Sequence, residues 1–318
     1  MLRSAEIVLN AYRAGIVIPA FNIPYLPMME PVIRAIVDQD SFAFIETARL
    51  EWFKFEAGGP DEVMAEFRKW NKPEYVRLHL DHVPVIDEDD IRIDYLPIIK
   101  HAIDLGYHSV MIDGSRLSLD ENIAATRRVV ELAHHAGIAC EAELGAVLGH
   151  EAGPLPPYDE LFETGRGFTR IDEAERFVNE TGCDWLSVAV GSIHGAISGT
   201  QKDQKKVEAR LNLDHLEQLR EATQIPLVLH GGSGVRQSDV LAAFKKGIAK
   251  INIGSEIRQA YERTRLETGR VEAAQEAAQE AVYKRTTELI RDYLGNAGIR
   301  STVAGETITP HDKGRAIP

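Results

Sequence analysis

The chain has 318 residues, a net charge of −13 and a pI of about 5.4. This charge argues against a broad nucleic-acid-binding surface, which would need an excess of Lys and Arg. Hydrophobic residues make up 44% of the chain, enough for a sizeable core, and the two cysteines are too few for a disulfide framework. The N-terminus has no apolar signal core, and no stretch approaches the roughly 20 apolar residues of a membrane span. We therefore expect a cytoplasmic protein that binds neither nucleic acid nor membrane.

Short apolar segments rich in β-branched residues alternate with segments of helical periodicity. A leading helix is predicted over residues 5–15. The predicted strands occupy residues 16–22, 42–47, 76–82, 109–115, 139–145, 185–190, 226–230 and 250–255. The predicted helices between and after them occupy residues 28–40, 60–70, 95–105, 119–136, 172–181, 213–222, 238–246 and 256–266, and residues 272–294 extend the helical tail.

Eight strand–helix repeats in about 250 residues are the pattern of a barrel of parallel strands. A doubly wound open sheet is the main rival, but no Gly-x-Gly-x-x-Gly follows the first strand. We predict an α/β fold, a (β/α)8 TIM barrel with an extra N-terminal helix and a C-terminal helical extension. Residues 1–300 are expected to form one domain, and residues 301–318 a loose C-terminal tail.

Polar residues gather at the carboxyl ends of the predicted strands, where barrels of this type place their sites. The third strand ends on Asp81 and His82, and His194 and His230 follow two later apolar runs. A single such histidine would more often be a hydrogen-bonded structural residue, as we expect for His79. Three imidazoles from three strand ends suit a zinc ion that keeps one open position.

Two glutamates on the fifth strand are candidates for the same centre. Glu141 and Glu143 are two residues apart, so their side chains face the same way. Glu143 is nearer the strand end and could reach a metal or a histidine ligand. For Glu141, a salt bridge to a neighbouring helix is nearly as good an interpretation.

Glycine-rich turns follow the last two strands. Residues 231–234 read Gly-Gly-Ser-Gly, and Asn252 is followed by Ile, Gly254 and Ser255. Barrels often bind phosphate here, because successive backbone N–H groups can approach the anion. Arg258, one turn into the following helix, could add positive charge or simply face solvent.

Together these motifs resemble the class II (metal-dependent) fructose-bisphosphate/tagatose-bisphosphate aldolase family. The resemblance runs from Ala20-Phe-Asn22 to the helical tail. It is carried by Leu78-His-Leu-Asp-His82, Val110-Met-Ile-Asp-Gly-Ser115, Glu141-Ala-Glu-Leu-Gly145, Gly191-Ser-Ile-His-Gly195, Leu227-Val-Leu-His-Gly-Gly-Ser-Gly234 and Lys250-Ile-Asn-Ile253.

The resemblance implies a lyase that reversibly cleaves a ketose phosphate or bisphosphate into dihydroxyacetone phosphate and an aldehyde, through a zinc-stabilised enediolate. It implies one catalytic Zn²⁺ on His82, His194 and His230. Glu143 would serve an alternative or second metal position, and a monovalent cation lies nearby in some members. It further implies a homodimer or a homotetramer.

Other positions acquire roles from the same resemblance. Asp81 matches the acid/base that handles the hydroxyl of the cleaved bond. Glu151 matches a loop glutamate that moves the proton of the ketone donor. The candidate substrate and phosphate contacts are Asn22, Ser115, Gly195, Gly231, Gly232, Ser233, Asn252, Gly254, Ser255 and Arg258.

The chain departs from the family pattern where substrate contacts are made. Val83 replaces the usual glycine after Asp-His, and Glu46-Thr-Ala-Arg-Leu-Glu51 replaces a serine-containing turn. Gly254-Ser255 and Ala152 are further departures. The resemblance therefore supports the metal site and the carbon–carbon bond cleavage more strongly than it supports the family's usual substrate. This favours a specialised ketose-phosphate aldolase.

Two rival functions remain open. A metal-dependent barrel hydrolase or isomerase could use the same histidines, although it would usually carry His-x-His after the first strand, where this chain has Ala-Phe-Asn. A non-catalytic ligand-binding relative would not need Asp81 and Glu151.

Overall fold

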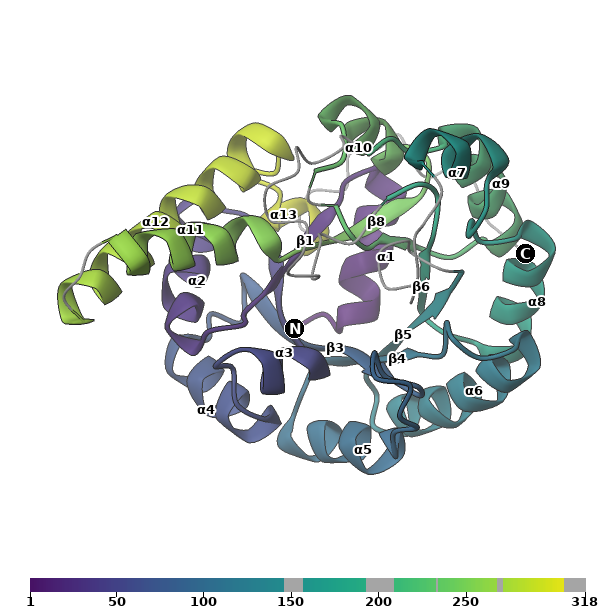
Figure 1. The fold of residues 1–318 in the computed structure, drawn as a ribbon, viewed down its shortest axis with the longest axis horizontal. Coiled ribbons are helices and arrows are strands. Elements are labelled where there is room, and N and C mark those ends of the chain that lie inside the picture. The colour runs from purple at the N-terminus through teal and green to yellow at the C-terminus, as the bar shows by residue number, and fades with distance from the viewer. Residues whose placement is uncertain (146–156, 193–208, 233, 268–270, 306–318) are drawn as a thin grey trace.

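The computed structural model describes residues 1–145, 157–192, 209–232, 234–267 and 271–305. Eight parallel strands form a closed barrel in which each strand pairs with the next and β8 pairs back to β1. Figure 1 shows the strands at the centre of the molecule with the helices around them. The strands are β1 (Ile18–Asn22), β2 (Ala43–Ala48), β3 (Val76–Pro84), β4 (Ser109–Asp113), β5 (Ala139–Leu144), β6 (Trp185–Val188), β7 (Leu227–Leu229) and β8 (Ile248–Ile253). The predicted TIM barrel is confirmed.

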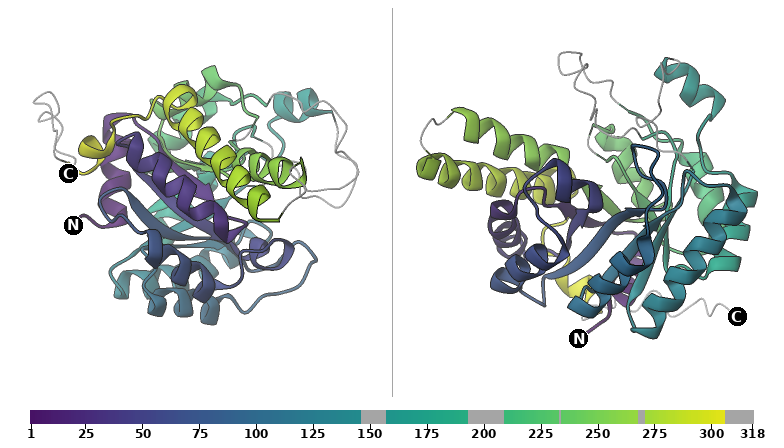
Figure 2. Two further views of the ribbon diagram at one scale, coloured as in Figure 1. Left: turned by 90° about the vertical axis from the view of Figure 1, so that its left-hand side faces the viewer. Right: turned by 60° about the horizontal axis from the view of Figure 1, so that its bottom comes forward.

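Helices surround the barrel and bury their apolar stripes against the strands (Figures 1 and 2). The helices that alternate with the strands are α2 (Met29–Asp38), α4 (Pro60–Trp70), α5 (Tyr95–Leu105), α6 (Leu119–His135), α8 (Ile171–Thr181), α9 (Leu213–Thr223), α10 (Gln237–Phe244) and α11 (Ser255–Glu267). The predicted extra helices are α1 (Ser4–Ala14) and α12 (Val271–Glu288), and short turns form η1 (Leu26–Met28) and η2 (Leu289–Tyr293).

The ends of α6 show how local sequence sets the helix bounds. Ser118 and Glu121 form a capping box, in which Ser118 Oγ accepts from Glu121 N at 3.4 Å and Glu121 Oε2 accepts from Ser118 N at 3.2 Å. Just beyond the helix, Gly137 adopts a φ of 73°, a left-handed conformation that glycine tolerates best. The chain then turns directly into β5.

The amino end of the barrel is closed by an apolar plug. Ile7, Val8 and Ala11 of α1 pack with interior residues at the beginnings of the strands, among them Phe44 and Trp185. All five side chains are buried. Because this end is filled with apolar atoms, the polar side chains of the strands can gather only toward the carboxyl end.

Three short helices were not predicted. α3 (Arg49–Lys54) follows β2 directly, and α7 (Tyr158–Thr164) lies within the predicted irregular loop. α13 (Arg300–Val303) occupies residues 301–303, which the sequence assigned to a loose tail. Val303 is buried, and its carbonyl accepts from Asn10 Nδ2 of α1 at 3.0 Å, so this segment is held against the leading helix.

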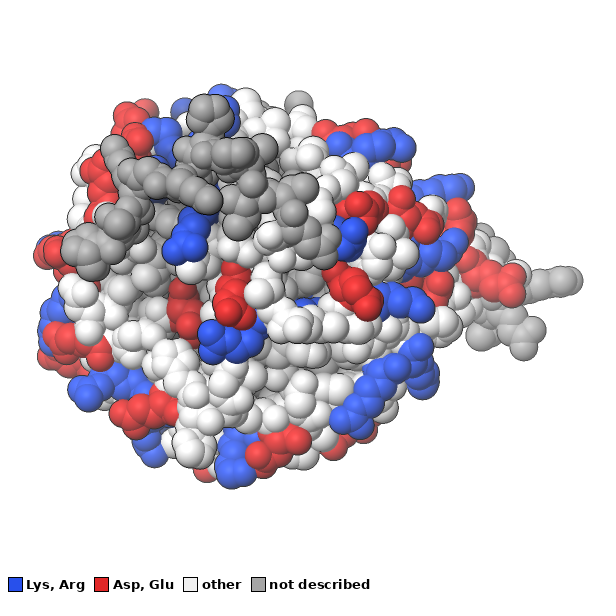
Figure 3. All heavy atoms as spheres, turned by 180° about the vertical axis from the view of Figure 1, so that it is seen from behind, with Lys and Arg blue, Asp and Glu red and all other residues white. Residues whose placement is uncertain are grey.

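The α11–α12 pair extends beyond the ring of helices (Figures 1 and 2). α12 packs against α2 as well as α11, and Ala278 and Val282 are buried there. Leu266, near the end of α11, is 84% exposed. The side of the molecule in Figure 3 carries interspersed acidic and basic residues among those described. A search of the described helices finds none with the length and apolar character needed to cross a membrane.

Candidate metal centre and active site

A break in the strand pairing brings Asp81 and His82 to the same place. Adjacent residues of a regular strand point to opposite faces. Here the register between β3 and β4 shifts between Leu80 and Val83, which is a β-bulge, and His82 adopts a φ of 28°. This strained conformation turns the His82 ring toward the barrel mouth while Asp81 keeps its inward direction.

His82 and His230 lie together at the carboxyl end of the barrel. Their ring centroids are 4.5 Å apart. Glu143 Oε2 lies 3.1 Å from His230 Nδ1 and 3.7 Å from His82 Nδ1. Asp113 Oδ2, at the end of β4, lies 3.1 Å from His82 Nδ1. The four side chains come from β3, β4, β5 and the residue after β7.

The donor set fits a divalent cation. Ligand atoms of His82, Asp113 and Glu143 lie within 4.8 Å of one another, as do those of Asp81, His82 and His230. Glu143 Oε2 is buried and makes no hydrogen bond within the described part of the chain. Burial raises the pKa of Glu143, and the nearby Asp113 raises it further. A cation among these oxygens and ring nitrogens would satisfy the orphaned oxygen and offset the repulsion.

Glu141 contacts the His230 ring at Nε2, the nitrogen that faces away from Glu143. Its Oε1 lies 2.8 Å from His230 Nε2, and Trp185 Nε1 donates to its Oε2 at 2.6 Å. A carboxylate at Nε2 favours a proton there, which leaves Nδ1 as the ligand atom on the side of Glu143. Glu141 therefore faces the barrel interior. The alternative of a salt bridge to a neighbouring helix is wrong.

Lys250, a buried lysine to which the sequence analysis gave no role, connects β8 with β2 and β5 inside the barrel. Lys250 Nζ lies 3.0 Å from Glu141 Oε2 and 3.1 Å from Glu46 Oε2, and all three side chains are 0% exposed. Burial alone would lower the pKa of Lys250, but Glu141 and Glu46 outweigh it and raise the pKa. The charged form of the lysine is thus held inside the barrel.

Asp81 is held as an ionised acceptor by two amides. Asn22 Nδ2 donates to its Oδ2 at 2.9 Å, and Asn252 Nδ2 donates to its Oδ1 at 3.0 Å. Lys250 Nζ donates to Asn252 Oδ1 at 2.6 Å and so fixes which way that amide points. Burial would raise the pKa of Asp81, but His82 and Lys250 outweigh it and lower the pKa.

The glycine-rich turns close the site on the side of β7 and β8. Gly231 has a φ of 68°, which favours glycine. A Cβ on Gly254 would lie 3.1 Å from Asn22 Cβ, so the backbone there approaches β1 closely. Ser255 begins α11, whose first N–H groups and dipole favour an anion.

The remaining predicted residues divide into two groups. Ser115 donates from N and Oγ to Asp113 Oδ1 at 3.0 and 2.6 Å, and Arg258 pairs with Glu262 at 2.8 Å. Gly232 lies in the turn beside Ile251, which a Cβ on it would meet at 2.6 Å. The others lie outside the described residues: Glu151, His194, Gly195 and Ser233.

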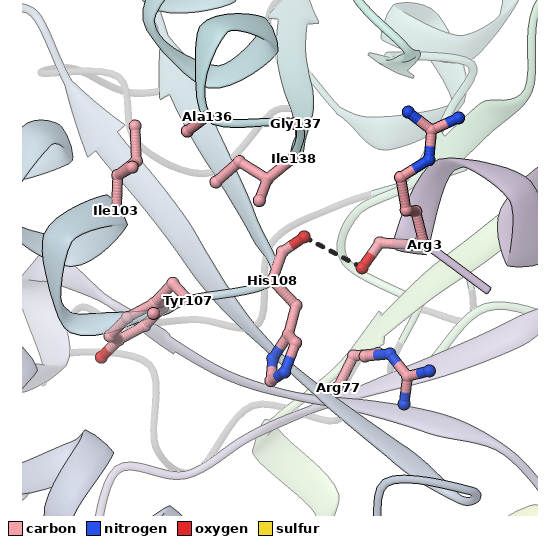
Figure 4. Close-up of a pocket in the computed structure, with 10 residues that line it drawn as sticks. Arg3, Arg77, Ile103, Tyr107, His108, Ala136, Gly137 and Ile138 are labelled. Atoms are coloured by element: carbon pink, nitrogen blue, oxygen red, sulfur yellow. Dashed lines mark hydrogen bonds between the residues drawn. The ribbon is translucent and has the colours of Figure 1, made fainter. Parts of the chain in front are cut away.

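A separate hollow lies at the opposite end of the barrel (Figure 4). Arg3, Arg77, Tyr107 and His108 line it, at the amino ends of β3 and β4. The Arg77 guanidinium donates to backbone carbonyls, including Leu2 O at 3.1 Å. The hollow is separated from the candidate metal centre by the interior of the barrel.

Fold and site together define a parallel barrel with a cluster of acids and histidines at the carboxyl ends of its strands, whose ligand atoms fit a metal ion. The model of the class-II fructose-bisphosphate aldolases matches residues 3–298. The chain therefore belongs to the class-II fructose-bisphosphate aldolase family, whose members are generally zinc-dependent.

Individual relatives agree with this assignment. A fructose-bisphosphate aldolase of Staphylococcus aureus is 38% identical over 181 residues, 57% of this chain and 54% of the relative. The match thus spans about half the length of the curated relatives. The crystal structure of the YdjI aldolase from Escherichia coli K12 is 28% identical with a TM-score of 0.71, covering 93% of this chain and 98% of that chain. A Campylobacter jejuni fructose-bisphosphate aldolase, 19% identical with a TM-score of 0.69 over 92% of this chain and 94% of that chain, shares the fold.

Proposed function

We propose that the protein is a metal-dependent aldolase that reversibly cleaves a ketose phosphate into dihydroxyacetone phosphate and an aldehyde. The observation that carries this proposal is the placement of Asp81. Its ionised carboxylate, fixed by Asn22 and Asn252, stands beside the histidine pair that fits a metal. An aldol cleavage needs a base for one hydroxyl next to a group that polarises the neighbouring ketone.

The metal ligands in this proposal are His82, His230 and His194, with Glu143 at an alternative or second position. When bound, zinc supplies polarisation of the ketone and stabilises the negative charge of the departing donor half. Glu141 keeps Nδ1 of His230 directed at the centre, and the bulge in β3 keeps His82 there.

Asp81 takes the proton of the hydroxyl whose carbon leaves as the aldehyde. Asn22 donates one hydrogen bond to Oδ2 of Asp81, and Asn252 donates one to Oδ1. These bonds orient the carboxylate, and each oxygen keeps a lone pair that can accept a proton. Glu151 is proposed to move the proton of the ketone donor. The turns containing Gly231, Gly254 and Ser255 are proposed to hold its phosphate through backbone N–H groups.

The remaining predictions concern the whole chain. One domain over residues 1–300, a cytoplasmic location and a homodimer or homotetramer stay predictions. The protruding α11–α12 pair, with Leu266 84% exposed, is the described surface that best suits a partner subunit.

The test measures dihydroxyacetone phosphate released from a panel of ketose phosphates and bisphosphates, with zinc and with a chelator. We expect release that the chelator abolishes and that falls at least about 100-fold in Asp81→Ala, because the base is lost. Asp61→Ala, the same change on the outer helix α4, is the matched control. Zinc bound without release from any panel member would instead favour the hydrolase, isomerase or ligand-binding alternatives.

A further inference from the structure

Glu51 is an acidic residue that reaches the candidate site from an unpredicted element. It lies on α3, the six-residue helix that follows β2 at the carboxyl end of the barrel. Its Oε2 accepts from Ala48 N at 2.9 Å, which satisfies the backbone N–H of the last residue of β2. The Glu51 carboxylate thus accepts the Ala48 N–H, which is then not available to hydrogen-bond a substrate in the candidate site.

The same carboxylate is linked to the acid/base residue. Ala48, whose N–H Glu51 accepts, lies opposite Asp81 in the pairing of β2 with β3, and the Asn22 amide donates to Asp81 Oδ2 at 2.9 Å. Asp81 and His82 are both close enough to affect the charge of Glu51. Glu51 therefore stands on the side of Asp81, where the aldehyde half would lie, and across the barrel mouth from the turns after β7.

Negative charge is disfavoured at this position. Burial raises the pKa of Glu51 to about 8, and Asp81 adds to the rise, although the hydrogen bond from Ala48 opposes it. A phosphate beside Glu51 would meet the same Asp81 charge. It would also find the Ala48 N–H already bonded to Glu51 and the Asn22 amide already bonded to Asp81.

Arginines that follow nearby strand ends are themselves paired. Arg49, after β2, lies 3.5 Å from Asp87 and stacks 4.9 Å from the Phe53 ring. Arg116, after β4, pairs with Asp90 at 2.6 Å. These two cations are already partly neutralised, which weakens their attraction for a second phosphate on this side.

We propose that Glu51 is a specificity-determining residue that selects an uncharged, hydroxyl-bearing aldehyde half. The preferred substrate is then a ketose monophosphate whose only phosphate is on the dihydroxyacetone side. A carboxylate accepts hydrogen bonds from sugar hydroxyls and repels a phosphate. The inference rests on the proposed function, and it concerns the half of the substrate that Asp81 releases.

The experiment compares fructose 1-phosphate with fructose 1,6-bisphosphate, two ketoses that differ only in the second phosphate. Assays at pH 8.5 favour the ionised form of Glu51, whose pKa is raised to about 8. The wild-type enzyme is expected to have the higher kcat/KM for the monophosphate. Glu51→Gln, whose amide oxygen can still accept from Ala48 N, is expected to narrow that ratio about 10-fold, mainly by lowering KM for the bisphosphate.

Glu62→Gln is the matched control. Glu62 accepts from Gly59 N at 2.9 Å at the start of α4, the same kind of helix cap on the outside of the barrel. This variant should leave the ratio unchanged, and thermal unfolding checks that both variants fold. The inference is overturned if wild type prefers the bisphosphate, or if both variants give the wild-type ratio. No cleavage of any panel ketose by wild type would instead reject the proposed function.

Discussion

Glu141 decides which nitrogen of His230 faces the candidate metal centre. The carboxylate lies 2.8 Å from Nε2, on the side away from Glu143, and Trp185 and Lys250 fix its second oxygen. An imidazole ligand needs one nitrogen without a proton, and a carboxylate at the other nitrogen favours that tautomer. Glu141 therefore acts on the metal indirectly, through His230. Its loss should weaken the binding of the metal more directly than it changes the catalytic step.

Glu141→Gln should weaken zinc binding by about 10- to 100-fold, because the amide can present a donor where Nε2 needs an acceptor. The dissociation constant is measured by competition with a chromophoric chelator, without substrate. Ser187→Ala, at a buried position of the neighbouring strand β6, is the control for a small change inside the barrel. Equal zinc affinity of the Glu141→Gln variant and wild type would show that Glu141 does not set the tautomer.

At the scale of elements, Lys250 joins three strands across the barrel interior. Its ammonium on β8 lies 3.1 Å from Glu46 on β2 and 3.0 Å from Glu141 on β5. The buried Glu141 carboxylate and the buried Lys250 ammonium are stable only as a pair, since each charge alone would be costly to bury. The group also fixes Asn252, which donates to Asp81.

Lys250→Met should lower the free energy of unfolding by about 3–5 kcal/mol, because it leaves the buried Glu141 carboxylate without its cation. Adding Glu46→Gln should change this loss by less than about 1 kcal/mol, because burial and the nearby Asp81 hold the pKa of Glu46 well above its usual value, so that no second charge is removed. Denaturant unfolding measures both. Lys246→Met, which breaks a surface pair with Glu217 at 2.6 Å, should cost less than about 1 kcal/mol. A Lys250→Met variant as stable as this control would contradict the argument.

Periodicity predicted the long elements and failed for the short ones. The predicted helix over residues 60–70 matches α4, whose Val63, Met64 and Phe67 are buried. α3 buries no residue and α7 buries only Leu161, so neither has an apolar stripe to detect. The sequence marked the segment that ends at Glu51 as a departure from the family pattern but gave Glu51 no role, because that role depends on a helix that the pattern does not show.

The site was predictable only as a set of strand ends. These residues lie at or near the carboxyl ends of their strands, which the barrel brings together: Asn22, Asp81, His82, His230 and Asn252. The alternation of side chains along a regular strand would have placed His82 on the face opposite Asp81. No sequence signal predicts the β-bulge that brings the two side chains to the same place. The pairing of Lys250 with Glu46 and Glu141 depends on the registers of strands β2, β5 and β8, which chain order does not give.

Across the whole molecule, polarity changes along the barrel axis. Apolar side chains of α1 and the strand beginnings fill the amino end, the lysine–glutamate group lies inside, and the acids and histidines of the site lie at the carboxyl end. The apolar residues that stabilise the fold at the amino end therefore lie far from the polar residues of the candidate site at the carboxyl end. A histidine at the amino end can be tested for stability without touching the site.

His108 is such a residue. Its Nδ1 accepts from Leu78 N at 3.0 Å, and its ring packs 5.9 Å from that of Phe67. Burial lowers its pKa from 6.5 to about 4, and Arg77 contributes in the same direction. The unfolded chain therefore binds the proton near pH 6.5 and the folded chain only near pH 4. Between these values the unfolded state holds more protons, so the contribution of His108 to stability is complete above pH 6.5 and is lost as the pH falls toward 4.

His108→Asn should remove this part of the pH dependence, because the amide oxygen can accept from Leu78 N but does not titrate. We expect wild type to lose on the order of 1–3 kcal/mol more than the variant between pH 7 and pH 4.5. Denaturant unfolding with chelator present measures the difference without a contribution from metal release. His135→Asn, at the exposed end of α6, should keep the wild-type slope. If His108→Asn kept it as well, the neutral state of His108 would not be what stabilises the amino end of the barrel.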